Sequence, residues 1–133
     1  MAEKTAKGAE EFVRYFWAVQ NYAYATLDVE ILNKVSDHSC SFCKATARNI
    51  SSLRDTGTDV SGSRVHVLSI SIPPAEIETG IIVGAVINQE SAKLTRADGT
   101  TSTSAPLSKA QSFVSLNWER GRWLVADVAI EEG

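Results

Sequence analysis

Between residues 9 and 25 apolar side chains recur every three or four positions, which is the spacing of one face of an amphipathic helix. That face carries Phe12, Tyr15, Phe16, Val19, Tyr22 and Ala23. A second apolar stripe, made of Val13, Trp17 and Tyr24, lies beside it and widens the apolar arc. We therefore expect a long first helix that is packed on two of its sides.

Two shorter helices are predicted next. Asp28 is placed to cap a short second helix whose apolar residues are Ile31, Leu32 and Val35. A third helix is predicted from about Ser39 to Asp55, and Thr56-Gly57 ends it. All the predicted helices thus precede residue 58.

Beyond Gly62 the apolar period changes from helical to two, which predicts strands. The predicted strands cover residues 65–72, 81–90, 111–118 and 122–130, with a hairpin formed by residues 91–95 and 100–103 around Asp98-Gly99. In the first strand, we expect His66, Leu68, Ile70 and Ile72 to share the more apolar face. Gly84 is a candidate bulge or sharp bend in the second strand.

Helices followed by antiparallel strands predict an α+β fold, in which three helices pack on a strongly curved antiparallel sheet of about four to six strands. At 133 residues, with 44% apolar and 22% charged residues, the chain is long enough for one domain with its own core. We assign residues 9–133 to this single domain, and residues 1–8 to a flexible N-terminus or to residues added for recombinant expression.

The charge balance argues against nucleic acid as a partner. The formal net charge is −3, and the densest basic segment is Arg120-Gly121-Arg122. No apolar run approaches the roughly 20 residues that cross a bilayer, and residues 1–10 lack the apolar core of a signal peptide.

Cys40 and Cys43, the two cysteines of the chain, form a Cys-x-x-Cys motif at the start of the third predicted helix. A structural disulfide, half of a zinc site and a redox centre all fit such a motif. Zinc would recruit His38 and His66, although a second closely spaced ligand pair is lacking. Redox chemistry would use the helix N-terminus to stabilise a thiolate, but the βαβ context of a thioredoxin-like motif is absent.

Three helices, long bent strands and the terminal hairpin from Trp118 to Val125 resemble the cone-shaped nuclear-transport-factor-2-like superfamily. More narrowly, the segments Gly8–Tyr15, Asn21–Thr26 and Cys40–Cys43 resemble a family of uncharacterised actinobacterial lipoproteins of that superfamily type. The resemblance implies an extracytoplasmic, membrane-anchored domain whose signal sequence and lipidated cysteine precede residue 1. It also implies an oxidising compartment, and hence a Cys40–Cys43 disulfide, and makes a homodimer through the outer face of the sheet plausible.

Enzymes of this superfamily place an Asp, His or Tyr inside the cone. The resemblance therefore makes His66, Asp127, Tyr15 and Tyr22 the catalytic candidates, but no catalytic pair matches at its proper spacing, and we expect neither a metal nor a cofactor. A pocket for an apolar ligand would be lined by Tyr15, Phe16, Val19, Tyr22, Leu68, Ile70, Trp118 and Trp123. The aromatic residues of this set fit an ordinary core equally well.

Two functions follow as hypotheses. The preferred one is a non-enzymatic extracytoplasmic domain that binds a small apolar ligand or a protein partner. The alternative is a cofactor-free isomerase, dehydratase or cyclase that works by general acid–base catalysis within the cone.

Overall fold

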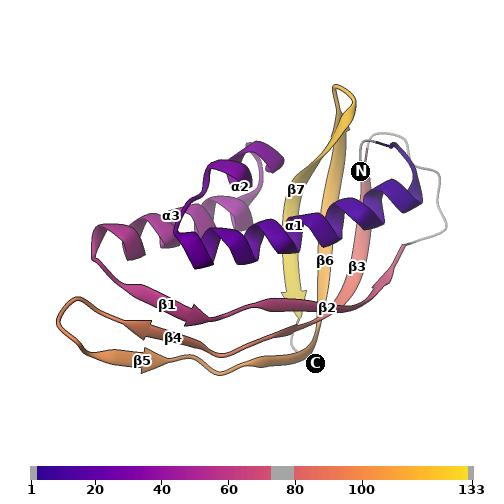
Figure 1. Ribbon diagram of the computed structural model, residues 1–133. Helices are drawn as coiled ribbons and strands as arrows, with labels where there is room; N and C mark the ends of the chain where they lie inside the picture. The colour runs from indigo at the N-terminus through magenta and orange to yellow at the C-terminus, as the bar shows by residue number, and fades with distance from the viewer. Residues whose placement is uncertain (1–2, 73–79, 132–133) are drawn as a thin grey trace.

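Three helices cover one side of a bent antiparallel sheet (Figure 1). The computed structural model describes residues 3–72 and 80–131. The helices are α1 (Ala6–Thr26), α2 (Glu30–Val35) and α3 (Ser41–Asp55). The strands in the described residues are β1 (Asp59–Gly62), β2 (Val65–Ser71), β3 (Gly80–Gln89), β4 (Ala92–Thr95), β5 (Thr101–Thr103), β6 (Leu107–Glu119) and β7 (Arg122–Glu131). The predicted α+β fold, with three helices packed on a curved antiparallel sheet, is confirmed.

The strands form a four-stranded sheet, in the order β2-β3-β6-β7, and a three-stranded sheet, in the order β1-β4-β5. Because β1 leads into β2, β3 into β4 and β5 into β6, the two sheets are the two arms of three long bent strands (Figure 1). Backbone hydrogen bonds continue across the bend, from Ser63 N to Ser91 O (3.1 Å) and from Glu90 N to Arg64 O (2.9 Å). We call the three-stranded arm the wing.

The core lies between α1 and the inner face of the four-stranded sheet. Its largest fully buried side chains include Phe16, Leu32, Ile87, Leu116 and Trp123. On its other side α1 meets α3, where the rings of Trp17 and Phe42 lie 6.3 Å apart, edge to face. The prediction that the first helix is packed on two sides is therefore confirmed. Within the described part of the chain, no helix combines the length and apolarity needed to cross a bilayer.

The first helix begins earlier in the chain than predicted. Helix α1 begins at Ala6 rather than Ala9, and the Thr5 hydroxyl caps it by accepting a hydrogen bond from Gly8 N (3.0 Å). The indole Nε1 of Trp123 donates to the carbonyl oxygen of Glu3 (2.9 Å). Residues 3–8 thus contain a helix cap, the first residues of α1 and a hydrogen bond to a core side chain; residues 1–2 lie outside the described residues.

The predicted facing of β2 is wrong in its first half. The pairing of β2 with β3 shifts register between Val67 and Ser69, so one additional residue reverses the alternation. Ile70 packs against the core as predicted, whereas His66 and Leu68 are exposed. The predicted bulge at Gly84 is also absent: that residue pairs in regular register with Phe113.

Candidate functional site

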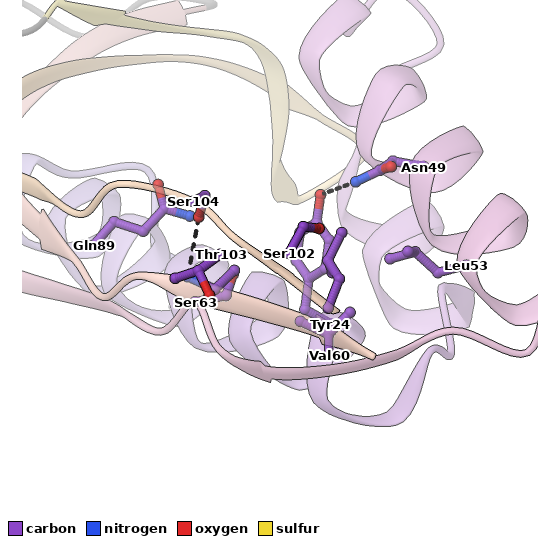
Figure 2. A pocket seen from close by; sticks show the side chains of 11 residues that line it. Tyr24, Asn49, Leu53, Val60, Ser63, Gln89, Ser102, Thr103 and Ser104 are labelled. Carbon is purple, nitrogen blue, oxygen red and sulfur yellow. Dashed lines mark hydrogen bonds between the residues drawn. The ribbon is translucent and has the colours of Figure 1, made fainter. Parts of the chain in front are cut away.

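A hollow of about 330 Å³ lies where the wing faces the C-terminal parts of α1 and α3 (Figure 2). We call it the mouth hollow. Its lining comes from both helices, from the wing and from the bend: Tyr24, Asn49, Leu53, Val60, Ser63, Gln89, Ala92, Leu94, Ser102, Thr103 and Ser104. The volume lies within the range of small-molecule pockets.

Polar contacts between helices fix one wall of the mouth hollow. The Asn49 amide Nδ2 donates to the Tyr24 hydroxyl oxygen (3.0 Å), which joins α3 to α1 at the edge of the hollow (Figure 2). One turn earlier in α1, the Gln20 amide donates to the Thr46 hydroxyl (3.1 Å), and both of those residues are buried. The two pairs set the spacing of α1 and α3.

The opposite wall is the wing, whose contacts are mostly to backbone. The Ser104 hydroxyl accepts a hydrogen bond from Ala92 N (3.0 Å), tying the start of β4 to the end of β5 (Figure 2). The Ser102 hydroxyl accepts from Arg96 Nη2 (2.9 Å). This wall therefore presents small hydroxylated side chains on hydrogen-bonded strands.

The lining of the mouth hollow contains no Asp, Glu, His, Lys or Arg, and its one titratable group is the Tyr24 phenol. The other described hollows differ in this respect. A hollow of about 390 Å³ beside α2 and the β6–β7 turn is lined by residues that include Asp37, Arg120 and Arg122. The mouth hollow is thus an uncharged site on a chain in which 22% of the residues are charged.

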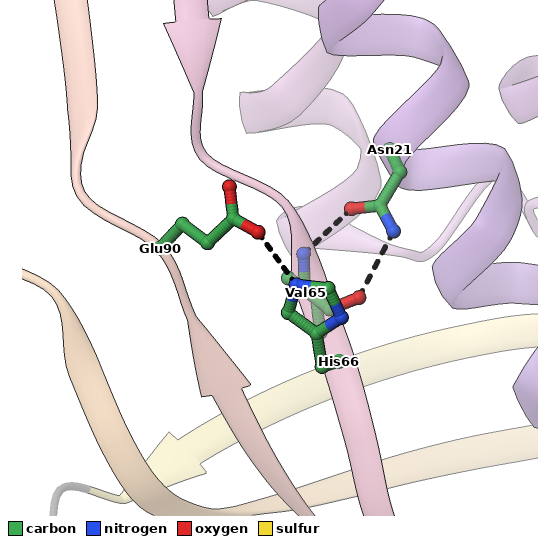
Figure 3. Close-up of polar contacts among 4 residues, drawn as sticks. All are labelled: Asn21, Val65, His66 and Glu90. Atoms are coloured by element: carbon green, nitrogen blue, oxygen red, sulfur yellow. Dashed lines mark hydrogen bonds and ion pairs between the residues drawn. The ribbon is translucent and has the colours of Figure 1, made fainter.

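The opening of the mouth hollow depends on the bend between β1 and β2, and Asn21 of α1 holds that bend (Figure 3). Its amide Nδ2 donates to Val65 O (3.0 Å), and its Oδ1 accepts from Val65 N (2.8 Å). At the same place, His66 Nε2 lies 2.6 Å from Glu90 Oε2 on the exposed surface (Figure 3). Both contacts fix where the wing leaves the four-stranded sheet.

The structure does not bring the four catalytic candidates together. The side chain of His66 is 51% exposed and pairs with Glu90. Asp127 is exposed on β7, where its Oδ1 accepts from Phe42 N (3.3 Å) and from Val128 N (2.9 Å). Asp127 therefore caps the N-terminus of α3.

The two tyrosine candidates occupy other surroundings. Tyr15 is half-buried, with its ring 6.3 Å from that of Phe12. Tyr22 is 46% exposed and borders a groove of about 490 Å³ beside α1, which is also lined by Asn21 and Arg64. Neither tyrosine lines the mouth hollow, and neither is hydrogen-bonded to His66 or Asp127.

The side chains predicted to line an apolar pocket are distributed over the core and the surface. Phe16, Val19 and Trp123 are buried in the core, and Tyr15, Ile70 and Trp118 pack partly buried against it. Leu68 and Tyr22 are exposed. None of the eight lines the mouth hollow. The lining of the mouth hollow was not predicted from the sequence. The available signal is the run of hydroxylated residues from Thr100 to Ser104, which by itself predicts only part of a hairpin.

The two cysteines form the expected disulfide, with Cα atoms 5.2 Å apart. Both residues are buried, and Cys40 Sγ accepts a hydrogen bond from Cys43 N (3.1 Å) at the start of α3. His38 is exposed, and in residues 3–72 and 80–131 no group of three His, Cys, Asp or Glu side chains is arranged to hold a metal ion. The disulfide thus sits in the core as a local clip.

The segment before the disulfide is attached to the edge of the sheet. Asp37 N donates to Val125 O (2.8 Å), and Ser36 forms a parallel bridge with Val125. Hydrogen bonds from Ser39 N and from the Asn117 amide hold the pKa of Asp37 below its ordinary value. The loop, the disulfide and Asp127 together fix the start of α3.

Solved structures of similar fold span nearly the whole chain. The intermembrane space region of the chloroplast protein ARC6 is 18% identical, with a TM-score of 0.66, over 97% of this chain and 98% of that one. The association domain of C. elegans CaMKII is 13% identical, with a TM-score of 0.55, over 97% and 99%. A putative aromatic ring hydroxylase from Novosphingobium aromaticivorans is 8% identical, with a TM-score of 0.60, over 90% and 85%. At these identities the likeness shows the fold alone.

Among curated proteins, no sequence matches the chain significantly. A family described as a family of unknown function, DUF6318, matches residues 1–129. Since the match covers almost the entire sequence, the chain belongs to the DUF6318 family.

Proposed function

We propose that this protein is a non-enzymatic binding domain that holds a small neutral ligand in the mouth hollow. The observation that carries the proposal is the composition of the lining: side chains that can hydrogen-bond or contact apolar groups, and no carboxylate, imidazole, thiol or amine. General acid–base catalysis needs such a group within hydrogen-bond reach of the substrate. Only the Tyr24 phenol is available, and its oxygen already accepts a hydrogen bond from Asn49.

The alternative, a cofactor-free isomerase, dehydratase or cyclase, has less support. It needs His66 or Asp127 to face a cavity close to a tyrosine hydroxyl, whereas His66 pairs with Glu90 and Asp127 caps α3. Phe16 and Trp123, which such an enzyme would need as pocket walls, are buried in the core cluster. This packing supports a binding domain better than a sequestered reaction chamber.

A variant that fills the mouth hollow tests the binding function. Ala92 lines the hollow, whereas Lys93 is the next residue of the same strand and is exposed. We expect a library of neutral small molecules to shift the amide NMR resonances of Ser63, Gln89 and Ser102 in the unmodified protein and in Lys93→Phe, but not in Ala92→Phe. If no library member shifts these resonances in the unmodified protein, the proposal fails.

We further propose that the domain is extracytoplasmic and anchored to the membrane by a lipid on a cysteine upstream of residue 1. The Cys40–Cys43 disulfide supports an oxidising compartment. Expression from the native coding sequence in the source organism, with fatty-acid labelling and cell fractionation, tests this location. Recovery of unlabelled protein in the cytosol with both thiols reduced would contradict it.

A second copy of the chain is the partner we propose for the outer face of the four-stranded sheet. Leu68 and Ile82 are 49% and 54% exposed. Ile82 lies on the outer face of β3, because its neighbour Val83 is buried on the inner face. The similar fold of a domain named for association, that of C. elegans CaMKII, supports this role. We expect Ile82→Lys to reduce the solution mass from dimer to monomer, while Ile31→Lys on exposed α2 leaves it unchanged; a monomeric unmodified protein would contradict the proposal.

A further inference from the structure

The mouth hollow has hydrogen-bonding capacity that the fold leaves unused. Ser63 is 8% exposed and lines the hollow, and its hydroxyl makes no hydrogen bond within the described residues. The side-chain amide of Gln89 is half-buried and is equally unpaired there. Buried polar groups are normally hydrogen-bonded, so these two side chains have partners outside the protein, either water or a ligand.

The Tyr24–Asn49 pair also has donors and acceptors that the fold leaves free for hydrogen bonding. Tyr24 accepts a hydrogen bond from Asn49 but keeps its own O–H proton to donate, and Asn49 keeps its Oδ1 to accept. The unused groups thus comprise donors and acceptors in a single hollow. A hydroxyl group, which both donates and accepts, is the ligand group that matches such a mixture.

Apolar surface lies beside these polar groups. Leu53 from α3, Val60 from β1 and the ring of Tyr24 line the same hollow (Figure 2). Leu94 from β4 also belongs to this lining. A matching ligand therefore has one apolar face and several hydroxyls. A purely apolar molecule would leave Ser63 and Gln89 without partners, which costs binding free energy.

The absence of charge in the lining limits the ligand further. An ion bound in the hollow would lose hydration without meeting an opposite charge from a lining residue. The Arg96 guanidinium donates to the Ser102 hydroxyl (2.9 Å) but does not itself line the hollow. Three other hollows include charged residues, for example Arg64 in the groove beside α1, Arg48 between α2 and α3, and Arg122 beside α2.

From these contacts we propose that the mouth hollow binds a neutral saccharide of one or two rings. The C–H face of the sugar ring lies against Leu53, Val60 and the Tyr24 ring, and its hydroxyls bond to Ser63, Gln89 and the Tyr24–Asn49 pair. This inference rests on the proposed function, because it names the ligand class of the same site.

The test compares three kinds of probe by amide NMR titration of the whole chain. The probes are neutral saccharides (glucose, mannose, galactose, maltose and trehalose), glucose 6-phosphate as the charged counterpart, and camphor as a neutral apolar molecule. We expect at least one neutral saccharide to shift Ser63, Gln89 and Ser102 saturably, and glucose 6-phosphate to bind at least tenfold more weakly than the best saccharide.

Two variants and a matched control refine the test. Gln89→Leu and Ser63→Ala each remove a hydrogen-bonding group from the hollow, and each is expected to weaken saccharide affinity about tenfold. Gln111→Leu makes the same amide-to-apolar change on the outer face of β6 and should leave the affinity unchanged. Ser63→Ala keeps the inference testable if Gln89→Leu fails to fold.

The outcomes separate the two proposals. If camphor shifts the mouth amides and no saccharide does, the saccharide inference is overturned while a binding function stands. Equal affinity for glucose 6-phosphate and the best neutral sugar, or unchanged saccharide affinity in both variants, also overturns the inference. If no probe, and no member of the neutral library, shifts these amides, both proposals fall.

Discussion

Replacing Asn21 by alanine should loosen the bend that shapes the mouth hollow. The Asn21 side chain satisfies both backbone groups of Val65, at 3.0 and 2.8 Å, and Val65 is only 7% exposed. In Asn21→Ala the Val65 N–H and C=O lose these partners at a place where water has little access. Helix α1 itself should remain, because alanine is the best helix former.

The magnitude follows from the two lost hydrogen bonds. A buried polar group left without a partner costs about 1–3 kcal/mol, and Asn21 itself is half-buried, so we take about 2–4 kcal/mol for the pair. The higher helix propensity of Ala than of Asn stabilises the variant by about 0.6 kcal/mol. The net loss of about 1.5–3.5 kcal/mol is a large part of the 5–15 kcal/mol that stabilises a typical domain.

Urea unfolding followed by tryptophan fluorescence measures this loss. With a denaturant slope of about 2 kcal/mol/M, the midpoint should fall by roughly 1 M. The matched control is Asn33→Ala on α2, where an exposed asparagine without a side-chain hydrogen bond gains the same helix propensity. If the two variants differ by less than about 0.5 kcal/mol, Asn21 does not hold the bend, and the account of the mouth hollow is wrong.

Three further predictions concern the start of α3. Removing the disulfide in Cys40→Ala/Cys43→Ala should lower the free energy of unfolding by about 1.9 kcal/mol, the chain-entropy value for a four-residue loop. Urea denaturation measures this loss, and an unchanged free energy of unfolding would refute the prediction. Asp127→Ala should lower the free energy of unfolding by about 1 kcal/mol, because the N-terminus of α3 loses the hydrogen bond from Phe42 N to Asp127. The loss should be smaller in Asp127→Asn, whose amide oxygen still accepts that hydrogen bond. Thermal unfolding of both variants measures the difference. Because the pKa of Asp37 is lowered in the folded protein, its ionised form stabilises the fold above the ordinary aspartate value of 3.8, and this stabilisation is lost as the pH falls through the lowered pKa. Asp37→Asn should therefore show a shallower loss of stability than the unmodified protein in acid titrations below pH 3.8, and parallel curves would contradict this.

The helices and most strands could be predicted from the sequence because their apolar periods are regular. Helix α1 repeats apolar residues over five turns, and the final hairpin is marked by Arg120-Gly121, both of which adopt positive φ. Strand β1 (Asp59–Gly62) was missed, since it lies in the wing and has a single half-buried apolar residue, Val60. A short strand on a polar arm leaves almost no periodic signal.

The facing of His66 and Leu68 was mispredicted for a different reason. A residue pattern shows alternation but not the point at which one extra residue interrupts the pairing, and β2 contains such a point at Leu68. The role of Asp127 was equally hidden, because its partner Phe42 N lies 85 positions away in the sequence. Contacts of this kind depend on the tertiary structure rather than on local spacing.

The mouth hollow exists because the sheet bends, and the bend also determines what the site can do. Ser63 and Gly62 adopt positive φ at the turn from β1 to β2, so the wing leaves the core instead of closing over it. Phe16, Val19 and Trp123, which were predicted to line a pocket for an apolar ligand, are buried in the core instead. Under the proposed function, a ligand binds at the mouth hollow, where neutral hydroxyls and amides meet apolar side chains. A ligand held there would stay in contact with solvent, which suits reversible recognition better than chemistry that requires water to be excluded.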